Sequence, residues 1–220
     1  MKWRRGVGNQ NVEDRRGMRL GGGVPAVGGG LGVVGIVVFL LINVLGGGGG
    51  GGGGGGFGLP NLAPVAAPTQ EGEPLTAEDD DASQFMSFVL EDVQAAWRQI
   101  FDDAGRRYED TTLVLFTQAT QTGCGVGQSA TGPFYCPADR KVYIDLTFWE
   151  ELKNRFGAGG DFAQAYVVAH EVGHHVQTLL GISEQVQSRE DGIKLELQAD
   201  CFAGVWGNNA QAEELLERGD

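Results

Sequence analysis

The segment Val167–Gln177, VVAHEVGHHVQ, contains all three histidines of this 220-residue chain. It includes the pattern H-E-x-x-H, which runs from His170 to His174. Residues four positions apart on an α-helix lie about 40° apart around its axis, so both imidazoles can converge on one metal ion. The preceding residues, FAQAYVVA, are mostly apolar, as a buried helix requires. We therefore predict a metal-binding helix that is capped by Asp161 and ends near Leu180.

Glu171 lies beside the face formed by the two histidines, so we do not expect it to be a close third ligand. From this position its carboxylate can reach a water molecule on the metal. Zinc lowers the pKa of bound water toward about 7, and Glu171 would accept the proton as the water attacks a carbonyl carbon. The competing interpretation is a helix with two surface histidines that bind no metal.

The third metal ligand has to come from another element, because catalytic zinc usually has three protein ligands. The segment KLELQAD places Glu196 22 residues after His174 and Asp200 one helical turn later. On a helix that folds back, Glu196 can bind the metal while Asp200 accepts the other ring N–H of a ligand histidine. Acidic residues are abundant here, and three other carboxylates compete for this position: Glu190, Asp191 and Glu213.

Three further residues are candidates for roles near the site, and a fourth, Cys201, is expected to be structural. His175 lies outside the ligand face, so we expect a polar residue at the edge of the site. Tyr143 and Tyr166 could each donate a hydrogen bond to an oxyanion, and the sequence does not distinguish them. Cys201 lies in an apolar helical run and is expected to be a small buried hydrophobic residue.

Charge is distributed unevenly along the chain, whose formal net charge is −13. Residues 1–20 carry +4 and the remainder carries −17. The acidic remainder argues against a nucleic-acid partner, which would require a basic surface.

Residues 24–45 form an uncharged stretch that is long enough for one membrane-spanning helix. The basic residues before it place the N-terminal segment 1–23 in the cytosol and the rest of the protein in the periplasm or cell exterior. A cleaved signal peptide and a buried core helix are the alternatives. The long polar start and the lack of an A-x-A site disfavour the first, and the lack of an amphipathic partner disfavours the second.

After this stretch come eleven glycines and a segment rich in Pro, Ala and acid, so we predict a disordered tether over residues 46–83. The folded domain is then residues 84–220. The order of its elements, a helix, strands and then helices, predicts the α+β class. The expected elements are a helix over 83–105 with Ser83 as its N-cap, strands 111–119 and 141–149 (the second half-buried), and helices 148–157, 161–180, 183–206 and 210–218.

Cys124 and Cys136 lie twelve positions apart in a glycine-rich loop. In an oxidising compartment a disulfide between them would stabilise the fold by about 3 kcal/mol. Two unpaired thiols are the alternative, and zinc binding by this pair is less favoured because the spacing is not C-x₂₋₄-C.

Together, the segments VVAHEVGHHVQ and ELQADCFAGVW resemble the putative neutral zinc metallopeptidase family of membrane-anchored bacterial proteins. GPFYCPADRKVYIDLTFWEEL resembles the stretch before the zinc helix in that family, and the basic start, anchor and glycine-rich tether are similar too. The resemblance implies a zincin-like fold of the gluzincin type, with one zinc ion bound by His170, His174 and Glu196 and with Glu171 as the base. It also implies that the strand 141–147 is an edge strand that aligns a peptide substrate.

One feature departs from the family. Its members usually continue past the second metal helix with a further histidine-containing segment, whereas this chain ends at Asp220 and has no histidine after His175. We therefore expect a C-terminally truncated form that lacks an oxyanion-stabilising residue.

Two functions follow from this interpretation. The first is a membrane-anchored zinc endopeptidase that acts on peptides or proteins. The second is a catalytically silent zinc-binding module that holds protein partners at the same edge strand. Only the enzyme needs a group that stabilises a tetrahedral intermediate. A bare tethered structural domain is a third possibility and predicts no stoichiometric metal.

Overall fold

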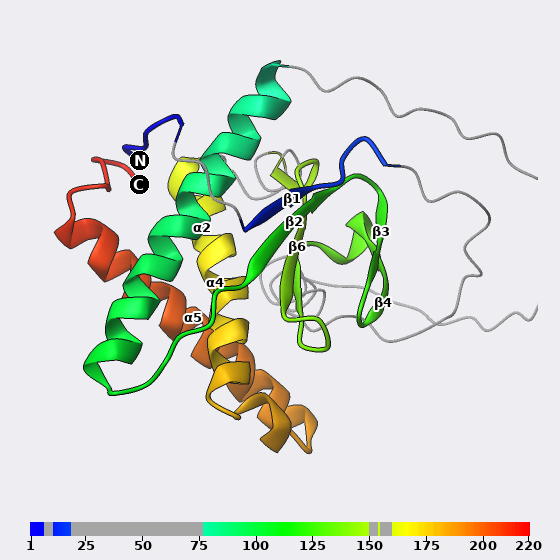
Figure 1. The fold of residues 1–220 in the computed structure, drawn as a ribbon, viewed down its shortest axis with the longest axis vertical. Helices are drawn as coiled ribbons and strands as arrows, with labels where there is room; N and C mark the ends of the chain where they lie inside the picture. Colours follow the sequence, from blue (N-terminus) through cyan, green and yellow to red (C-terminus); the bar gives the residue numbers. More distant parts are fainter. Residues whose placement is uncertain (7–10, 19–76, 150–153, 155–159) are drawn as a thin grey trace, which may run out of the picture.

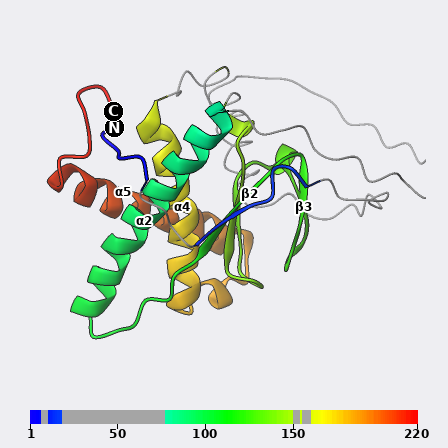
Figure 2. The same ribbon diagram turned by 45° about the horizontal axis from the view of Figure 1, so that its top comes forward.

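The computed structural model describes residues 1–6, 11–18, 77–149, 154 and 160–220. In these residues, helices lie on one side of a four-stranded sheet and a two-stranded hairpin lies on the other (Figures 1 and 2). The predicted α+β class is therefore confirmed. The helices are α2 (Ala77–Asp103), α4 (Asp161–Leu179) and α5 (Arg189–Ala212).

The main sheet has the strand order β1-β2-β6-β5. Its first three strands are parallel, and β5 is antiparallel to β6. The prediction that 141–147 forms an edge strand is wrong, because the loop that contains Cys136 supplies one further strand beside it. The strands are β1 (Val12–Asp14), β2 (Thr112–Phe116), β6 (Lys141–Asp145) and β5 (Phe134–Cys136).

Both faces of the sheet are buried. Leu113 and Ile144 pack in the core formed with the helices, whereas Val114 and Tyr143 belong to a second cluster on the opposite face. The hairpin of β3 (Ala119–Thr122) and β4 (Gly125–Gln128) covers this second face. The prediction of a half-buried strand is therefore wrong, because Tyr143 is only 1% exposed.

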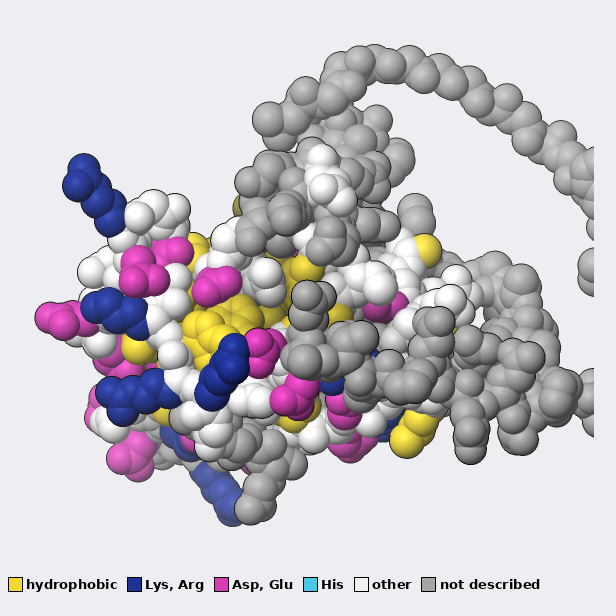
Figure 3. Space-filling view, turned by 90° about the horizontal axis from the view of Figure 1, so that it is seen from above, with side chains coloured by type: hydrophobic (Ala, Val, Ile, Leu, Met, Phe, Trp, Pro, Cys, Tyr) yellow, Lys and Arg dark blue, Asp and Glu magenta, His cyan; other side chains and the backbone are white. Residues whose placement is uncertain are grey.

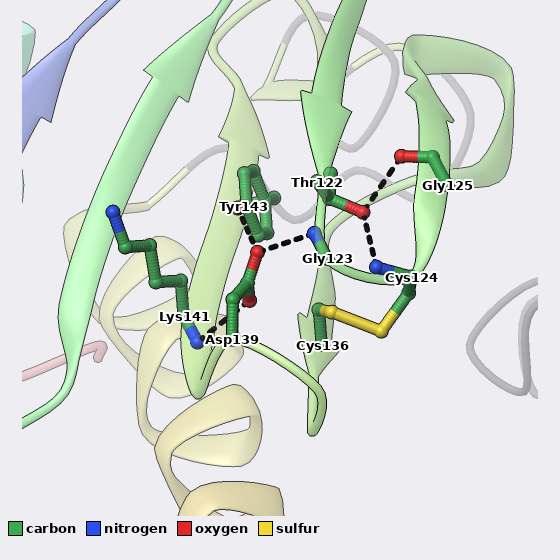
Figure 4. Close-up of a disulfide and its surroundings, with 8 residues drawn as sticks. All are labelled: Thr122, Gly123, Cys124, Gly125, Cys136, Asp139, Lys141 and Tyr143. Carbon is green, nitrogen blue, oxygen red and sulfur yellow. Dashed lines mark hydrogen bonds between the residues drawn. A yellow bond between two sulfur atoms is a disulfide. The ribbon is translucent and has the colours of Figure 1, made fainter.

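A disulfide fastens the hairpin to the edge of the main sheet. It joins Cys124 in the hairpin turn to Cys136 on β5, with a Cα–Cα distance of 5.8 Å (Figure 4). Beside it, the Asp139 carboxylate accepts hydrogen bonds from the Gly123 N–H and the Tyr143 hydroxyl, each at 2.6 Å. The segment expected to be an irregular loop is thus a cross-linked β-structure.

The helix boundaries differ from the prediction at several points. Helix α2 begins at Ala77 instead of Ser83, because the acidic residues of its first turns interact favourably with the positive end of the helix dipole. Gly160 takes the N-cap position of α4, where we expected Asp161. Ser188 caps α5 by accepting a hydrogen bond from a backbone N–H of its first turn, and a 3₁₀ turn (Ser183–Gln185) precedes it.

Two short predicted helices have different outcomes. The separate last helix over 210–218 does not form, because α5 continues to Ala212 and turns follow it. The predicted helix over 148–157 lies mostly outside the described residues.

The N-terminal residues belong to the folded domain. Strand β1 is hydrogen-bonded to β2, and the side chain of Met1 is buried in the main core. For the described residues of 1–23, the prediction of a separate segment is therefore wrong, because β1 belongs to the main sheet and Arg5 is paired with Asp81 on α2. The cytosolic placement of this segment stays a prediction. The predicted anchor 24–45 and most of the tether 46–83 lie outside the described residues. None of the helices described is long and apolar enough to span a membrane.

Acidic and basic side chains are interspersed around an apolar area on the face shown in Figure 3. On this face, the acidic excess of the chain therefore does not form a surface of a single sign.

The disulfide closes a short loop, so its loss should destabilise the domain. We expect Cys124→Ser/Cys136→Ser to lower the free energy of unfolding by about 3 kcal/mol, because the unfolded chain regains conformational entropy. Urea unfolding of the full chain measures this, with Cys201→Ser as the control, since Cys201 is an exposed free thiol. An unchanged midpoint in the double variant would show that the cross-link contributes nothing.

Candidate metal centre

The candidate metal centre lies at a tight contact between α4 and α5. Gly173, between the two histidines of the motif, packs directly on the backbone of Ala199. A Cβ atom at Gly173 would lie 3.1 Å from the Ala199 carbonyl oxygen and 3.2 Å from its Cα, which is tighter than ordinary contact. The glycine therefore permits a helix separation that brings Glu196 to the histidines.

Three buried side chains converge at this point. The Nε2 atom of His170 lies 3.3 Å from one carboxylate oxygen of Glu196, and the Nε2 atom of His174 lies 3.5 Å from the other. The candidate ligand atoms of all three residues lie within 4.8 Å of one another. Ligands about 2.0–2.1 Å from a tetrahedral zinc ion are about 3.3–3.4 Å apart, so the observed spacings fit one ion.

Hydrogen bonds at the far side of each imidazole select the required tautomer. The Nδ1–H of His170 donates to Asp200 over 2.9 Å, and the Nδ1–H of His174 donates to Gln177 over 2.9 Å. Each acceptor is an oxygen, so the proton is on Nδ1. In the neutral ring that a metal ion requires, each Nε2 atom then carries its lone pair toward Glu196.

Gln177 is a functional candidate that sequence reasoning missed. Its side chain is fully buried, and its amide NH₂ donates to the Leu195 carbonyl over 2.7 Å and to the Gln198 side chain over 3.0 Å. These bonds fix the amide orientation, so the carbonyl end faces His174. One side chain thus orients a ligand histidine and holds the α5 backbone at the residue before Glu196. Its position three residues after His174 on the same helix was the available signal.

The cluster has strongly coupled electrostatics. Burial disfavours the charged form of Glu196, but the two histidines outweigh it and lower the pKa to about 2. Burial also opposes the charged form of His170, yet Asp200 and Glu196 raise its pKa to about 10. For His174, the partner Glu196 likewise outweighs burial and raises the pKa. The carboxylates therefore favour positive charge between these helices.

Glu171 is fully buried beside the three converging residues. Burial raises its pKa, while the positive potential of His170 and His174 opposes that change. The oxygens of Glu171 and Glu196 make no well-formed hydrogen bond with the described residues. Among these residues, only the Tyr135 backbone N–H lies close enough to Glu171, and only the two ligand imidazoles close enough to Glu196, to lower the pKa of these carboxyl groups as hydrogen-bond donors. Buried carboxylates need a donor or a cation, so this donor set fits a divalent metal ion.

The two candidate tyrosines have partners away from the converging Nε2 atoms. Tyr143 donates to Asp139 on the hairpin side of the sheet. The Tyr166 hydroxyl lies 3.3 Å from an Asp200 carboxylate oxygen, on the Nδ1 side of His170. Burial raises the pKa of Tyr166 to about 12, so it remains a hydrogen-bond donor. Its position supports Asp200, and neither tyrosine is placed as an oxyanion donor.

His175 is a buried structural residue, which corrects the expectation that it lies at the edge of the site. Its Nε2–H donates to the Glu109 carbonyl over 2.6 Å, so its Nδ1 accepts from the Tyr135 hydroxyl over 3.1 Å. Burial lowers its pKa, and the neutral ring satisfies both partners. A rotation of about 100° per residue turns it away from His174 and into the core.

The rival carboxylates have other partners. Glu190 is paired with Lys194 over 2.9 Å. Asp191 accepts a hydrogen bond from Ser188 at the start of α5, and Glu213 accepts one from Asn209 near its end.

Cys201 is exposed, so the prediction of a buried residue is wrong. It follows Ala199 by two positions and therefore lies about 160° away from it around α5. Ala199 faces α4, which leaves Cys201 on the outer side.

A family model described as "Putative neutral zinc metallopeptidase" matches residues 1–220. The chain belongs to this family. It is 41% identical over 235 aligned residues to the uncharacterised protein YpfJ of Escherichia coli (strain K12), covering all of this chain and 79% of that one. It is 45% identical over 120 residues to the uncharacterised protein Rv2575 of Mycobacterium tuberculosis, and this alignment covers 52% of this chain and 40% of that protein. No solved structure matches the chain.

The close helix contact predicts a position-specific effect of an added methyl group. Gly173→Ala should lower stability by about 1–3 kcal/mol and weaken zinc binding, because it forces α4 and α5 apart. Gly204→Ala on α5 is the matched control, since a Cβ there meets nothing within 4 Å. Chelator competition measures the affinity. Equal zinc affinity in the two variants would contradict the role given to the contact.

The ligand assignment predicts a ranking of zinc affinities. Glu196→Ala should nearly abolish zinc retention, whereas Asp200→Ala and Gln177→Leu should weaken it about 10–100-fold, the usual range for residues that orient ligands. Glu190→Ala should leave it unchanged. Zinc release to a chelator measures the relative zinc affinities of the variants. A large loss of zinc affinity in Glu190→Ala would mean that the third ligand is misassigned.

Proposed function

We propose that this protein is a zinc-dependent peptidase in which His170, His174 and Glu196 hold the metal and Glu171 is the general base. The observation that carries the proposal is the convergence of three ligand groups, at His–Glu196 distances that fit a tetrahedral ion, beside the fully buried carboxylate of Glu171. The family description supports the metallopeptidase class.

Bound zinc would supply Lewis-acid chemistry, lowering the pKa of a water molecule toward about 7 and polarising a carbonyl group. Glu171 is suited to accept a proton, because burial raises its pKa while it stays within reach of the ligand face. After accepting the proton, Glu171 can donate it to the leaving amine. Asp200 and Gln177 keep each histidine in the tautomer that leaves Nε2 free.

The substrate would be an extended peptide or protein segment. Strand β5 is the antiparallel edge of the main sheet, and it packs against α4. Its residue Tyr135 is held by His175, which follows the ligand His174 on α4. A peptide that pairs with β5 would therefore lie beside the metal ligands, as in other cases of β-augmentation.

A zinc-binding module without turnover is the second candidate. It is favoured by the positions of Tyr143 and Tyr166, whose hydroxyls have partners away from the metal side. Such a module would use the same β5 edge to hold a protein partner.

The disulfide supports placement of the domain in an oxidising compartment, outside the cytoplasmic membrane. Attachment to the membrane through residues 24–45 stays a prediction, and it is compatible with the pairing of β1 and β2 only if residues 1–18 lie on the same side of the membrane as the domain.

Glu171→Gln should retain zinc and lose peptide hydrolysis, because an amide cannot accept the proton. General-base removal typically costs about 10²–10⁴-fold in rate. The measurement combines zinc stoichiometry with cleavage of a peptide library by the full chain, and Glu190→Gln is the control with the same chemical change.

Three outcomes are distinguishable. Undiminished cleavage in Glu171→Gln would show that Glu171 is not the base. Stoichiometric zinc with no cleavage by the unmodified protein would favour the silent module. A protein that binds no stoichiometric zinc would contradict both proposals.

A further inference from the structure

The first residues of the chain complete the main sheet. At one end of β1, the Leu113 N–H donates to the Asn11 carbonyl over 2.8 Å, and at the other end the Arg15 N–H donates to the Leu115 carbonyl over 2.7 Å. These bonds extend the parallel ladder on the outer side of β2. The edge strand of the sheet on this side is thus the short, charged β1, and the apolar β2 is an inner strand.

Charged side chains fasten this strand to its neighbours. Glu13 accepts hydrogen bonds from Lys141 on β6 and from Arg15. The Arg15 guanidinium also donates to the Gln121 carbonyl on β3 over 3.1 Å. The strand therefore links the main sheet to the hairpin.

Residues 1–6 make separate contacts with the helices and the chain end. The amino group of Met1 lies 3.0 Å from the Asp220 carboxylate, and the Lys2 N–H donates to the Leu215 carbonyl over 2.7 Å. The Trp3 ring packs on Phe85 of α2 with a centroid separation of 5.4 Å. The two termini consequently lie together (Figure 1).

The main-chain groups of β2 explain why this edge needs a partner. The side chains of Leu113, Val114, Leu115 and Phe116 are all at most 1% exposed. An uncovered edge on such a strand would leave backbone N–H and C=O groups unpaired next to the core and open to association with other chains.

We infer that the β2 edge is the docking site of the chain's own N-terminal strand, so that residues 1–18 and 77–220 fold as one unit on one side of the membrane. A single crossing between residues 18 and 77 would put the two parts in different compartments and exclude the ladder. The 58 intervening residues are long enough to connect the two parts at up to about 3.3 Å each, and a covalent connection of this length favours pairing within one chain.

Thiol labelling of the full chain in cells tests the shared compartment. In the unmodified protein, labelling of the exposed Cys201 shows the compartment of the domain. In Gly17→Cys/Cys201→Ser, labelling of the new thiol shows the compartment of the N-terminal segment. A Cβ at Gly17 meets nothing within 4 Å, so the new thiol should not disturb docking. A membrane-impermeant maleimide is applied to cells with an intact cytoplasmic membrane and again after permeabilisation.

We expect both positions to react before permeabilisation, or both only after it. Reaction of one position before and the other only after permeabilisation would overturn the inference. As a control, each protein is also labelled after denaturation, and complete labelling there shows that its thiol is intact.

Cross-linking tests whether the docked strand comes from the same chain. The Asn11 and Asp110 side chains are 3.0 Å apart, so Asn11→Cys/Asp110→Cys in the Cys201→Ser background places two thiols within reach of a short bis-maleimide. We expect a cross-linked monomer by mass spectrometry, and neither single variant should form one. A cross-linked dimer would assign the strand to a second copy, and no cross-link between two reactive thiols would show that the strand is not docked.

Discussion

The contact between Gly173 and Ala199 is the constraint on which the metal centre depends. Two histidines on one helix define only part of a coordination sphere, and the third group has to come from another element at a fixed distance. Any side chain larger than hydrogen at position 173 would meet the α5 backbone. The glycine of the motif therefore has a packing role that is distinct from the chemistry of its neighbours.

Around this contact, the supporting hydrogen bonds serve both binding and stability. Gln177 and Asp200 each join a histidine of α4 to α5, so the bonds that orient the ligands also hold the helices in register. His175 makes the corresponding link on the other side of α4, to Tyr135 on β5 and to the loop before β2. The candidate site and the strand that would receive a peptide are therefore both attached to α4.

The parts predictable from the sequence were those encoded within single helices. The spacing of His170 and His174, and of Glu196 and Asp200, indicated which residues could meet, and the structure brings them together. The role of Gly173 was not predictable in this way, because one sequence does not show which residue a glycine will face. The same applies to His175, whose partners lie 40 and 66 positions away in the chain.

The sheet was the least predictable element. Strand β5 and the hairpin are runs of three or four residues in a glycine-rich segment, too short to show a periodic pattern, and a disulfide and long-range pairing determine their structure. Strand β1 is short and charged, and the basic residues around it suggested a cytosolic segment before a membrane anchor. The acidic start of α2 resembled a tether because the same residues favour both a disordered segment and a helix N-terminus.

The central claim is that one zinc ion joins α4 to α5. The most direct measurement is anomalous diffraction at the zinc edge from crystals of the zinc-loaded protein. The account predicts one peak about 2.0–2.2 Å from the Nε2 atoms of His170 and His174 and from a carboxylate oxygen of Glu196. A peak away from these atoms, or a zinc ion held by the histidines with Glu196 turned away, would contradict it.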